Sequence, residues 1–320
     1  MEAHGCESMI RAFIIFIAAV VATLVLSFSF SGANPFIGVD WFISLLFVIA
    51  TWIATWALSW IFDLYLPESL SRFVVPLVFG IGIIASWELY VWVSQIQIVL
   101  LPSPSEIGVK FATSLPILGA DFVQTILRSV IPGWLMGCGS GFLVALLCDR
   151  SDFLRRGLLP LGNLVAALPI VGAAPILVMW FGFDWPSKAA MVVVMTFFPM
   201  LINTLAGLNA SGHMERDLMK SYGADWLTTL LKLRLPAAMP FIFNALKINS
   251  TLAMIGAIVA EFFGTPIVGM GFRMSTEVGR LSLDMVWAEI LVAAITGSTF
   301  YGLLTLSERA VTFWHPSYRK

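Results

Sequence analysis

Eight stretches of about 20 mainly apolar residues dominate the sequence, and that is the length a helix needs to cross a bilayer core. They lie at roughly 11–31, 40–62, 73–95, 124–148, 157–181, 188–211, 240–263 and 285–307. None alternates apolar and polar residues as the strands of a membrane barrel do, so each predicts a helix. The sequence therefore predicts an all-α polytopic membrane protein with about eight transmembrane helices.

Composition supports the same class and excludes others. Hydrophobic residues make up 59% and charged residues 12% of the chain, whereas soluble domains average about 45–50% and about 25%. Such a surface must face lipid, which excludes a soluble enzyme and a disordered protein. The net charge of -1 leaves no basic surface for nucleic acid. Cys6, Cys138 and Cys148 have neither metal-ligand nor disulfide-framework spacing, so we expect no metal site in this chain.

The basic residues collect on one side of the eight-span map. Between spans and at the ends, that side carries Arg11, Arg72, Arg150, Arg155, Arg156, Arg216, Lys220, Lys232, Arg234, Arg309, Arg319 and Lys320. The opposite loops have few, with Arg273 and Arg280 as exceptions. The positive-inside rule makes the basic side cytoplasmic, so both termini are predicted inside. The first stretch is expected to be a retained helix, because its apolar run is longer than a signal-peptide core.

The inner loop 212–239 is amphipathic and divides at Gly223. Leu218, Met219 and Tyr222 predict a short helix before the glycine, and Trp226 opens a second apolar stripe after it. Gly223 suits the left-handed turn that ends a helix, and Asp225 suits a helix cap. The loop therefore predicts a helix-turn-helix at the inner membrane surface. From the residues alone, an interfacial helix pair that only anchors the loop is an equally good interpretation.

The same loop resembles the signature of binding-protein-dependent ABC transporter permeases, which reads Glu-Ala-Ala, three residues, Gly, nine residues, Ile, any residue, Leu-Pro. Gly223 and Ala224 begin a run with the same spacing, which ends at Leu233, Leu235 and Pro236. The Glu-Ala-Ala part is replaced by Asp217-Leu218-Met219. The resemblance implies that these residues contact an ATPase subunit: Asp217, Leu218, Met219, Gly223, Ala224, Leu233, Leu235 and Pro236.

Further motifs, in order, resemble the nitrate/sulfonate/taurine subgroup over residues 73–320. They are Leu101–Glu106, the pair Thr125 and Arg128, Leu168–Gly182, Phe197–Thr204 and Trp314–Arg319. Residues 1–72 have no counterpart in a six-span permease core. The resemblance thus divides the chain into two additional N-terminal helices, 1–72, and a permease core, 73–320.

The fifth stretch, 157–181, is the leading candidate for the substrate path. Its interior prolines, among them Pro169 and Pro175, free backbone groups that only protein or a water-filled path can satisfy at membrane depth. Asn203, Asn249 and Glu261 in the next two spans add polar groups to this candidate path. Helix packing is the alternative role for the prolines, interhelical hydrogen bonding for the amides, and a salt bridge for the carboxylate.

The resemblance implies a permease subunit of an ATP-driven importer in a bacterial cytoplasmic membrane. Its partners would be ABC ATPase subunits that bind ATP and Mg, a second permease subunit in a homodimer, and an extracytoplasmic solute-binding protein. The chain itself would be no enzyme and would hold no cofactor. The solute would be a small organic or anionic one. Because the outer halves of the spans offer carboxylates and amides, a neutral or zwitterionic solute is favoured. An ion-gradient-driven secondary transporter is the alternative, but its inverted repeats are not found.

Overall fold

A computed structural model describes residues 41–166, 170–264 and 267–313, and every regular element in these ranges is helical. The predicted first span, 11–31, and Pro169 lie outside the described residues. The chain forms two compact units. Unit 1 holds the described residues up to Thr113 together with Arg280–Ala288, and unit 2 holds Ser114–Gly279 and the residues from Glu289 onward.

Unit 1 is built on a helical hairpin, α2 (Trp41–Tyr65) and α3 (Glu68–Val93), followed by the short α4 (Pro104–Thr113). The hydroxyl of Ser71 donates to Asp63 at 2.7 Å and closes the hairpin turn. Midway along the pair, Gly82 lies directly against Thr55, so the two backbones approach closely there. The predicted domain boundary at residue 72 therefore falls inside α3.

The segment before α4 forms a capping box. The backbone N–H of Ser103 donates to Glu106 at 2.8 Å, and the N–H of Glu106 donates back to the Ser103 hydroxyl. Ser105 instead donates its backbone N–H and its hydroxyl to Glu88, at 2.9 and 2.7 Å. A carboxylate in an apolar helix is unfavourable unless it is hydrogen-bonded, and these two bonds satisfy Glu88 near the end of α3. The same bonds fix the start of α4.

Unit 2 is a bundle in which several short helices attach to four long helical segments among the described residues. Its elements are α5 (Leu115–Phe122), η1 (Val123–Val130), α6 (Ile131–Arg150), α7 (Asp152–Ala166), α8 (Ile170–Phe181), α9 (Trp185–Asn209), α10 (His213–Ser221), α11 (Trp226–Thr229), η2 (Leu230–Arg234), α12 (Leu235–Phe262), α13 (Met270–Gly279) and, shared with unit 1, α14 (Leu283–Val311). The elements η1 and η2 are π-helical turns. Each joins its neighbours into one long rod, Leu115–Arg150 and Trp226–Phe262.

Small residues allow α6 and α9 to pack closely. Gly133, Gly137 and Gly141 recur every four residues along one face of α6. A Cβ on Gly133 would stand 2.6 Å from Val192, one on Gly141 would stand 2.5 Å from the carbonyl oxygen of Phe197, and one on Gly137 would overlap the Thr196 hydroxyl. In a bilayer the burial of apolar surface contributes little to helix association, because lipid is itself apolar. Close van der Waals packing of this kind is therefore a main source of the stability of the helix pair.

The described residues contain six helices long and apolar enough to cross a membrane. The predicted fifth span differs: its residues form α7 and α8, of 15 and 12 residues, on either side of 167–169. At 1.5 Å per residue each is shorter than a core of about 30 Å. The predicted fourth and seventh spans are confirmed but longer, because their helices continue beyond the apolar stretch.

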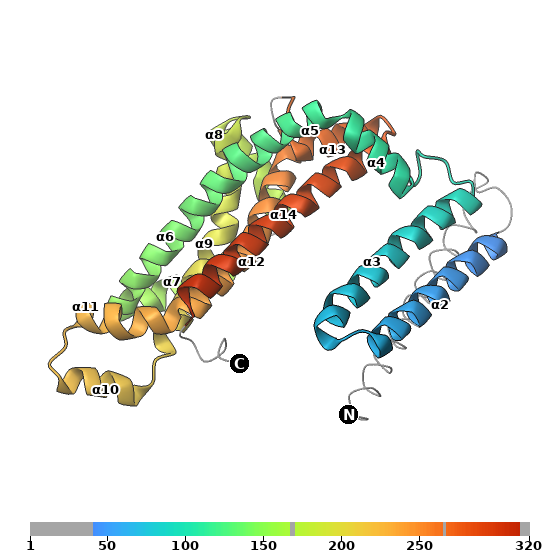
Figure 1. The fold of residues 1–320 in the computed structure, drawn as a ribbon. Helices are drawn as coiled ribbons and strands as arrows, with labels where there is room; N and C mark the ends of the chain where they lie inside the picture. Colours follow the sequence, from blue (N-terminus) through green and yellow to red (C-terminus); the bar gives the residue numbers. More distant parts are fainter. Residues whose placement is uncertain (1–40, 167–169, 265–266, 314–320) are drawn as a thin grey trace. The chain divides into compact units, whose positions relative to one another are not determined.

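The two ends of unit 2 carry different elements (Figure 1). At one end α10 and α11 project beyond the long helices, and α6, α9 and α14 finish there. At the other end lie α5, α8 and α13. Arg150, Arg216, Arg234 and Arg309 all belong to the end with α10. This grouping agrees with the charge asymmetry of the sequence.

Candidate functional site

Helix α10 presents an apolar stripe outside the bundle. Met214, Leu218 and Tyr222 follow one another at intervals of four residues and are 86%, 57% and 82% exposed. Met219, which the sequence grouped with them, is half-buried on the side toward the bundle. The α10 stripe, as we call Met214, Leu218 and Tyr222, is therefore a narrow surface available to a partner or to lipid.

The turn after α10 is a Schellman motif built on Gly223. Its φ is +72°, in the left-handed region that glycine adopts without strain. The N–H of Gly223 donates to the carbonyl of Lys220 at 2.9 Å, and the N–H of Ala224 donates to that of Met219 at 3.0 Å. These two bonds satisfy the last carbonyls of the helix. The predicted left-handed turn is confirmed.

Asp225 begins the second helix, as predicted. Its Oδ1 accepts the backbone N–H of Thr228 at 2.9 Å, and the bonds from Thr228 lower the pKa of this carboxyl. A lowered pKa means that the cap stabilises the folded form above the ordinary Asp range and is lost as pH falls through the lowered value. The helix does not stop inside the loop, however, since Trp226–Phe262 is one rod. Only residues 212–225 of the predicted loop 212–239 lie outside a spanning helix.

Arg216 fastens α10 to the end of α9. Its guanidinium donates to the carbonyls of Asn209 and Ser211 at 2.8 and 2.6 Å and to the Ser211 hydroxyl at 3.0 Å. A charged donor at the last carbonyls of a helix also favours the helix dipole. At the other end of the turn, Glu215 accepts the N–H of Gly212 at 2.8 Å. The attachment leaves the α10 stripe free while fixing the start of the helix.

Arg234 ties three long helices together. It donates to both carboxylate oxygens of Asp149 at 2.7 and 2.6 Å, and its Nε donates to the carbonyl of Leu208 at 3.0 Å. The side chains are 12% and 4% exposed, so the pair is largely shielded from solvent. Beside it the guanidinium of Arg150 lies 5.3 Å from the centre of the Trp226 ring. The ends of α6 and α9 are thus bonded to the start of the α12 rod.

The remaining predicted coupling residues lie at this junction. Leu235 is packed against a core cluster that includes Leu208 and Leu230, and Pro236 lies just after the π-helical turn, inside the continuous helix Trp226–Phe262. Leu233 and Ala224 are half-buried, and Asp217 is exposed beside Lys220. The sequence counted Arg216 and Arg234 only as positive charges and did not single out Asp149. Asp149 lies next to Arg150 at the end of the predicted fourth span, and that position was the available signal.

The two predicted pathway amides bond within the bundle. Asn249 is fully buried, and its Nδ2 donates to the carbonyl of Thr196 at 2.8 Å and to the Cys138 sulfur at 3.2 Å. Asn203 donates to the carbonyl of Pro199 in its own helix at 2.8 Å. In this conformation Asn249 joins α12 to α9 and α6, whereas Asn203 bonds within α9 and is half-buried.

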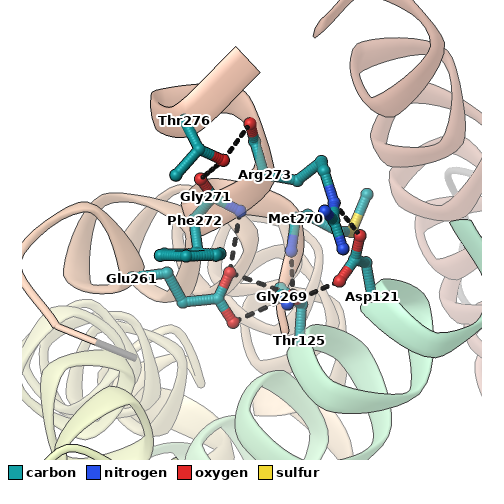
Figure 2. A network of polar contacts seen from close by, with 9 residues as sticks. All are labelled: Asp121, Thr125, Glu261, Gly269, Met270, Gly271, Phe272, Arg273 and Thr276. Atoms are coloured by element: carbon teal, nitrogen blue, oxygen red, sulfur yellow. Dashed lines mark hydrogen bonds and ion pairs between the residues drawn. The ribbon is translucent and has the colours of Figure 1, made fainter. Parts of the chain in front are cut away.

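Glu261 is also buried, in a polar cluster at the opposite end of unit 2 (Figure 2). Its carboxylate accepts the Thr125 hydroxyl at 2.9 Å and the N–H of Gly271 at 2.8 Å. The Thr125 oxygen in turn accepts the N–H of Met270 at 2.9 Å. Figure 2 shows how these groups converge on the first turn of α13. Glu261 therefore caps this helix.

Asp121 completes the cap from α5. Its Oδ1 accepts the N–H of Gly269 at 2.6 Å, and its Oδ2 accepts Nε of Arg273 at 2.9 Å (Figure 2). Two carboxylates and a hydroxyl from three segments thus satisfy the orphan donors at the N-terminus of α13. We call Asp121, Thr125, Glu261 and the α13 start the α13 clamp.

Helix α8 leaves one face open. Ala174 packs between Met191 of α9 and Ala260 of α12. On the opposite side Pro175, Ile176, Met179 and Trp180 are exposed. The predicted packing of this stretch against the sixth and seventh spans is confirmed, with an apolar outer face. Among residues 41–166, 170–264 and 267–313, no three His, Cys, Asp or Glu side chains are grouped to hold a metal.

Comparison with known proteins identifies this class of helical bundle. Residues 137–313 match the family of binding-protein-dependent transport system inner membrane components. The match covers α10, the turn at Gly223 and the junction at Arg234, and the chain belongs to this family. It is therefore the membrane-spanning permease subunit of an ABC importer, and ATP is hydrolysed in a separate subunit. The resemblance read from the loop is confirmed, and nothing supports the secondary transporter.

Individual relatives are similar over most of their length. The chain is 31% identical to a probable ABC transporter permease protein of Haemophilus influenzae, over 69% of this chain and 89% of that one. It is 27% identical to the putative aliphatic sulfonates transport permease protein SsuC of Bacillus subtilis, over 74% and 86%. It is also 27% identical to the formylaminopyrimidine transport permease protein ThiX of Halalkalibacterium halodurans, over 75% and 95%.

Proposed function

We propose that the α10 stripe docks in a groove of an ABC ATPase subunit and passes that subunit's movement to the permease. The observation that carries the proposal is an apolar stripe held outside the bundle by a Schellman turn and by Arg216. A helix that only anchored the loop in lipid would need the apolar stripe but not the Schellman turn or the bonds of Arg216. The bidentate bond of Arg234 to Asp149 gives the helix a firm connection to the spanning rods.

The mechanism requires differential binding. A partner that binds both permease conformations equally shifts neither. ATP binding in the ATPase would move α10, and the bonds of Arg216 and Arg234 would carry the movement to α9, α6 and α12. ATP and Mg would be bound entirely by the ATPase, and this chain would hold no cofactor.

The assembly and its orientation follow from the same family and from charge. Two copies of this chain would form a homodimer, with ATPase subunits at the α10 end and a solute-binding protein at the α13 end. The basic residues at the α10 end support an orientation in which that end faces the cytoplasm of a bacterial inner membrane. Both termini would then be cytoplasmic.

Residues 1–72 would be two additional helices outside a transport core of residues 73–320. The relatives cited above are covered over 86–95% of their length but match only 69–75% of this chain. The matched family region extends to residue 313, so the surplus is N-terminal.

The solute would pass along α7 and α8, whose exposed apolar face includes Pro175. Pro169 would lie on the same path. Asn203, Asn249 and Glu261 would contribute by fixing the helices beside it. The solute is a small organic or anionic molecule, which agrees with the aliphatic sulfonates and the formylaminopyrimidine in the names of the relatives. Weak contacts with an apolar face would leave selectivity mainly to the binding protein.

Co-purification with the ATPase tests the proposal. Leu218→Asp puts a charge in the centre of the stripe, and we expect it to abolish both ATPase binding and ATP-driven uptake in proteoliposomes. Lys220→Gln, on the same helix but outside the stripe, is the matched control and should retain both. Normal uptake by Leu218→Asp, or equal loss in Lys220→Gln, would refute docking through the stripe.

A further inference from the structure

Arg128 is a charged side chain exposed inside a membrane-spanning rod. It lies on the π-helical turn η1 within Leu115–Arg150, an element that is mostly apolar. An exposed guanidinium in such a rod is costly against lipid, and π-helical turns occur often at functional sites. Among the described residues no carboxylate lies within salt-bridge distance of it. Arg128 lies near the start of the predicted fourth span, so this part of the span carries a cation in addition to the carboxylates and amides of the other spans.

The side chain borders an open pocket of about 680 Å³ at the α13 end of unit 2. Gly119 and Val268 form part of its wall, and its polar groups are Gln124, Arg128 and Asp184. Nη1 of Arg128 donates to Oε1 of Gln124 at 3.1 Å, and Nε2 of Gln124 donates to Oδ1 of Asp184 at 3.3 Å. Gln124 itself is only 5% exposed. A buried amide therefore holds a cation and an anion apart on one pocket wall.

Asp184 behaves unusually for its position. It is the N-cap residue of α9, where an Asp normally accepts a backbone N–H of the first turn, yet its side chain makes no such bond. It accepts from Gln124 instead and stays in the pocket. The position therefore forgoes the stabilisation that an N-cap side chain normally gives a helix.

The charges around the pocket balance. Lys188 is buried beside it, donates to the carbonyl of Phe183 and lies in the field of both Asp184 and Glu261. The charged side chains that line the pocket itself are one cation, Arg128, and one anion, Asp184, so the lining carries no surplus charge. A simple anion would meet Arg128 but be repelled by Asp184, and an uncharged solute would leave both unpaired.

The geometry points to a binding site for a small dipolar ion, with its anionic group on Arg128 and its ammonium on Asp184. The inference rests on the proposed function, because it takes the occupant to be the solute at the outer mouth of the path. A dipolar lipid headgroup has the same chemistry, so the test must separate the two sources.

The test measures binding of 3-aminopropanoate and of propanoate to the purified full chain by saturation-transfer NMR. The probes differ by the ammonium group. In maltoside micelles, which have no charged headgroup, we expect 3-aminopropanoate to bind at least tenfold more tightly than propanoate. Arg128→Gln should weaken 3-aminopropanoate binding at least tenfold. Asp184→Asn, which keeps an acceptor for Gln124, should reduce it to the level of propanoate. Arg280→Gln, an exposed arginine outside the pocket, should change nothing.

Several results would overturn the site. They are no binding of either probe, equal binding of both to the unmodified chain, or binding that Arg128→Gln leaves unchanged. Loss of binding in phosphatidylcholine nanodiscs would assign the pocket to a lipid headgroup instead. The assay contains no ATPase, so a failed α10 docking would not alter it, and a failed site would leave the docking intact.

Discussion

Gly223 controls the direction in which the chain leaves α10. At φ +72° a residue with a Cβ pays about 1–2 kcal/mol, and a β-branched one pays more, although the space around the glycine is open. We expect Gly223→Val to lower ATP-driven uptake about tenfold or more. Gly223→Asn is the control, since Asn tolerates the left-handed region, and it should retain most of the activity. Uptake at the normal rate in Gly223→Val would show that the turn is not needed.

Asp149 and Arg234 form the bond that should transmit force between the helices. Removing one partner of a shielded pair costs about 3–5 kcal/mol because the other charge stays uncompensated. Asp149→Asn should therefore lower the thermal midpoint of the purified protein clearly. Asp217→Asn breaks an exposed pair worth at most about 1 kcal/mol and should barely shift it. Equal shifts in the two variants would mean that the junction is not rigid.

Predictions about single residues were confirmed where the structure depends only on residues close by in the sequence. The turn at Gly223 and the cap at Asp225 depend on a few neighbouring residues, and both were predicted. The bond between Arg234 and Asp149 joins positions 85 residues apart and needs the tertiary packing. For the same reason the partners of Glu261, which are Thr125 and the α13 start, could not be predicted from the sequence.

At the scale of elements, two glycines of α6 can be compared, because one lies against α9 and the other does not. Gly137→Ala would force a methyl into the Thr196 hydroxyl, so we expect a lower thermal midpoint. Gly139→Ala, two residues on, meets nothing within 4 Å and should be neutral or stabilising, because Ala exceeds Gly in helix propensity by about 1 kcal/mol. If both variants behave alike, α6 and α9 are not in close contact.

The α13 clamp is a second element-scale device. Thr125→Val removes the donor to Glu261 and the acceptor for Met270, and it leaves buried polar groups unpaired, at about 1–3 kcal/mol each. Hydrogen exchange at the start of α13 should accelerate in this variant. Thr276→Val loses only bonds to carbonyls of its own helix and should exchange normally. Unchanged protection in Thr125→Val would remove Thr125 from the clamp.

Hydropathy predicted the existence of the long helices better than it predicted the residues at which they begin and end. It averages over about 20 residues, so it identified the long helices but not their continuation beyond the apolar stretches at 115–123 and 226–239. It also merged α7 and α8 into one span, because both are apolar and lie close in sequence. Prolines suggested a kink there, but sequence alone did not show two helices too short to cross.

For the whole molecule, orientation is the property most easily measured. In a background lacking Cys6, Cys138 and Cys148, a cysteine at Ser151 should be shielded from an impermeant reagent added outside intact cells. A cysteine at Thr113, beside the predicted outer loop, should react. The basic residues at the α10 end require this pattern. Labelling at 151 from outside would reverse the topology.

The central claim is that α10 meets the ATPase, and site-specific photo-crosslinking in intact cells tests it most directly. A photoreactive residue at Leu218 should give a covalent adduct with the ATPase. The same residue at Leu143, which is equally exposed but lies midway along α6, should contact only lipid. Adducts of Leu218 with lipid alone, at normal ATPase levels, would contradict the account and make α10 a membrane anchor.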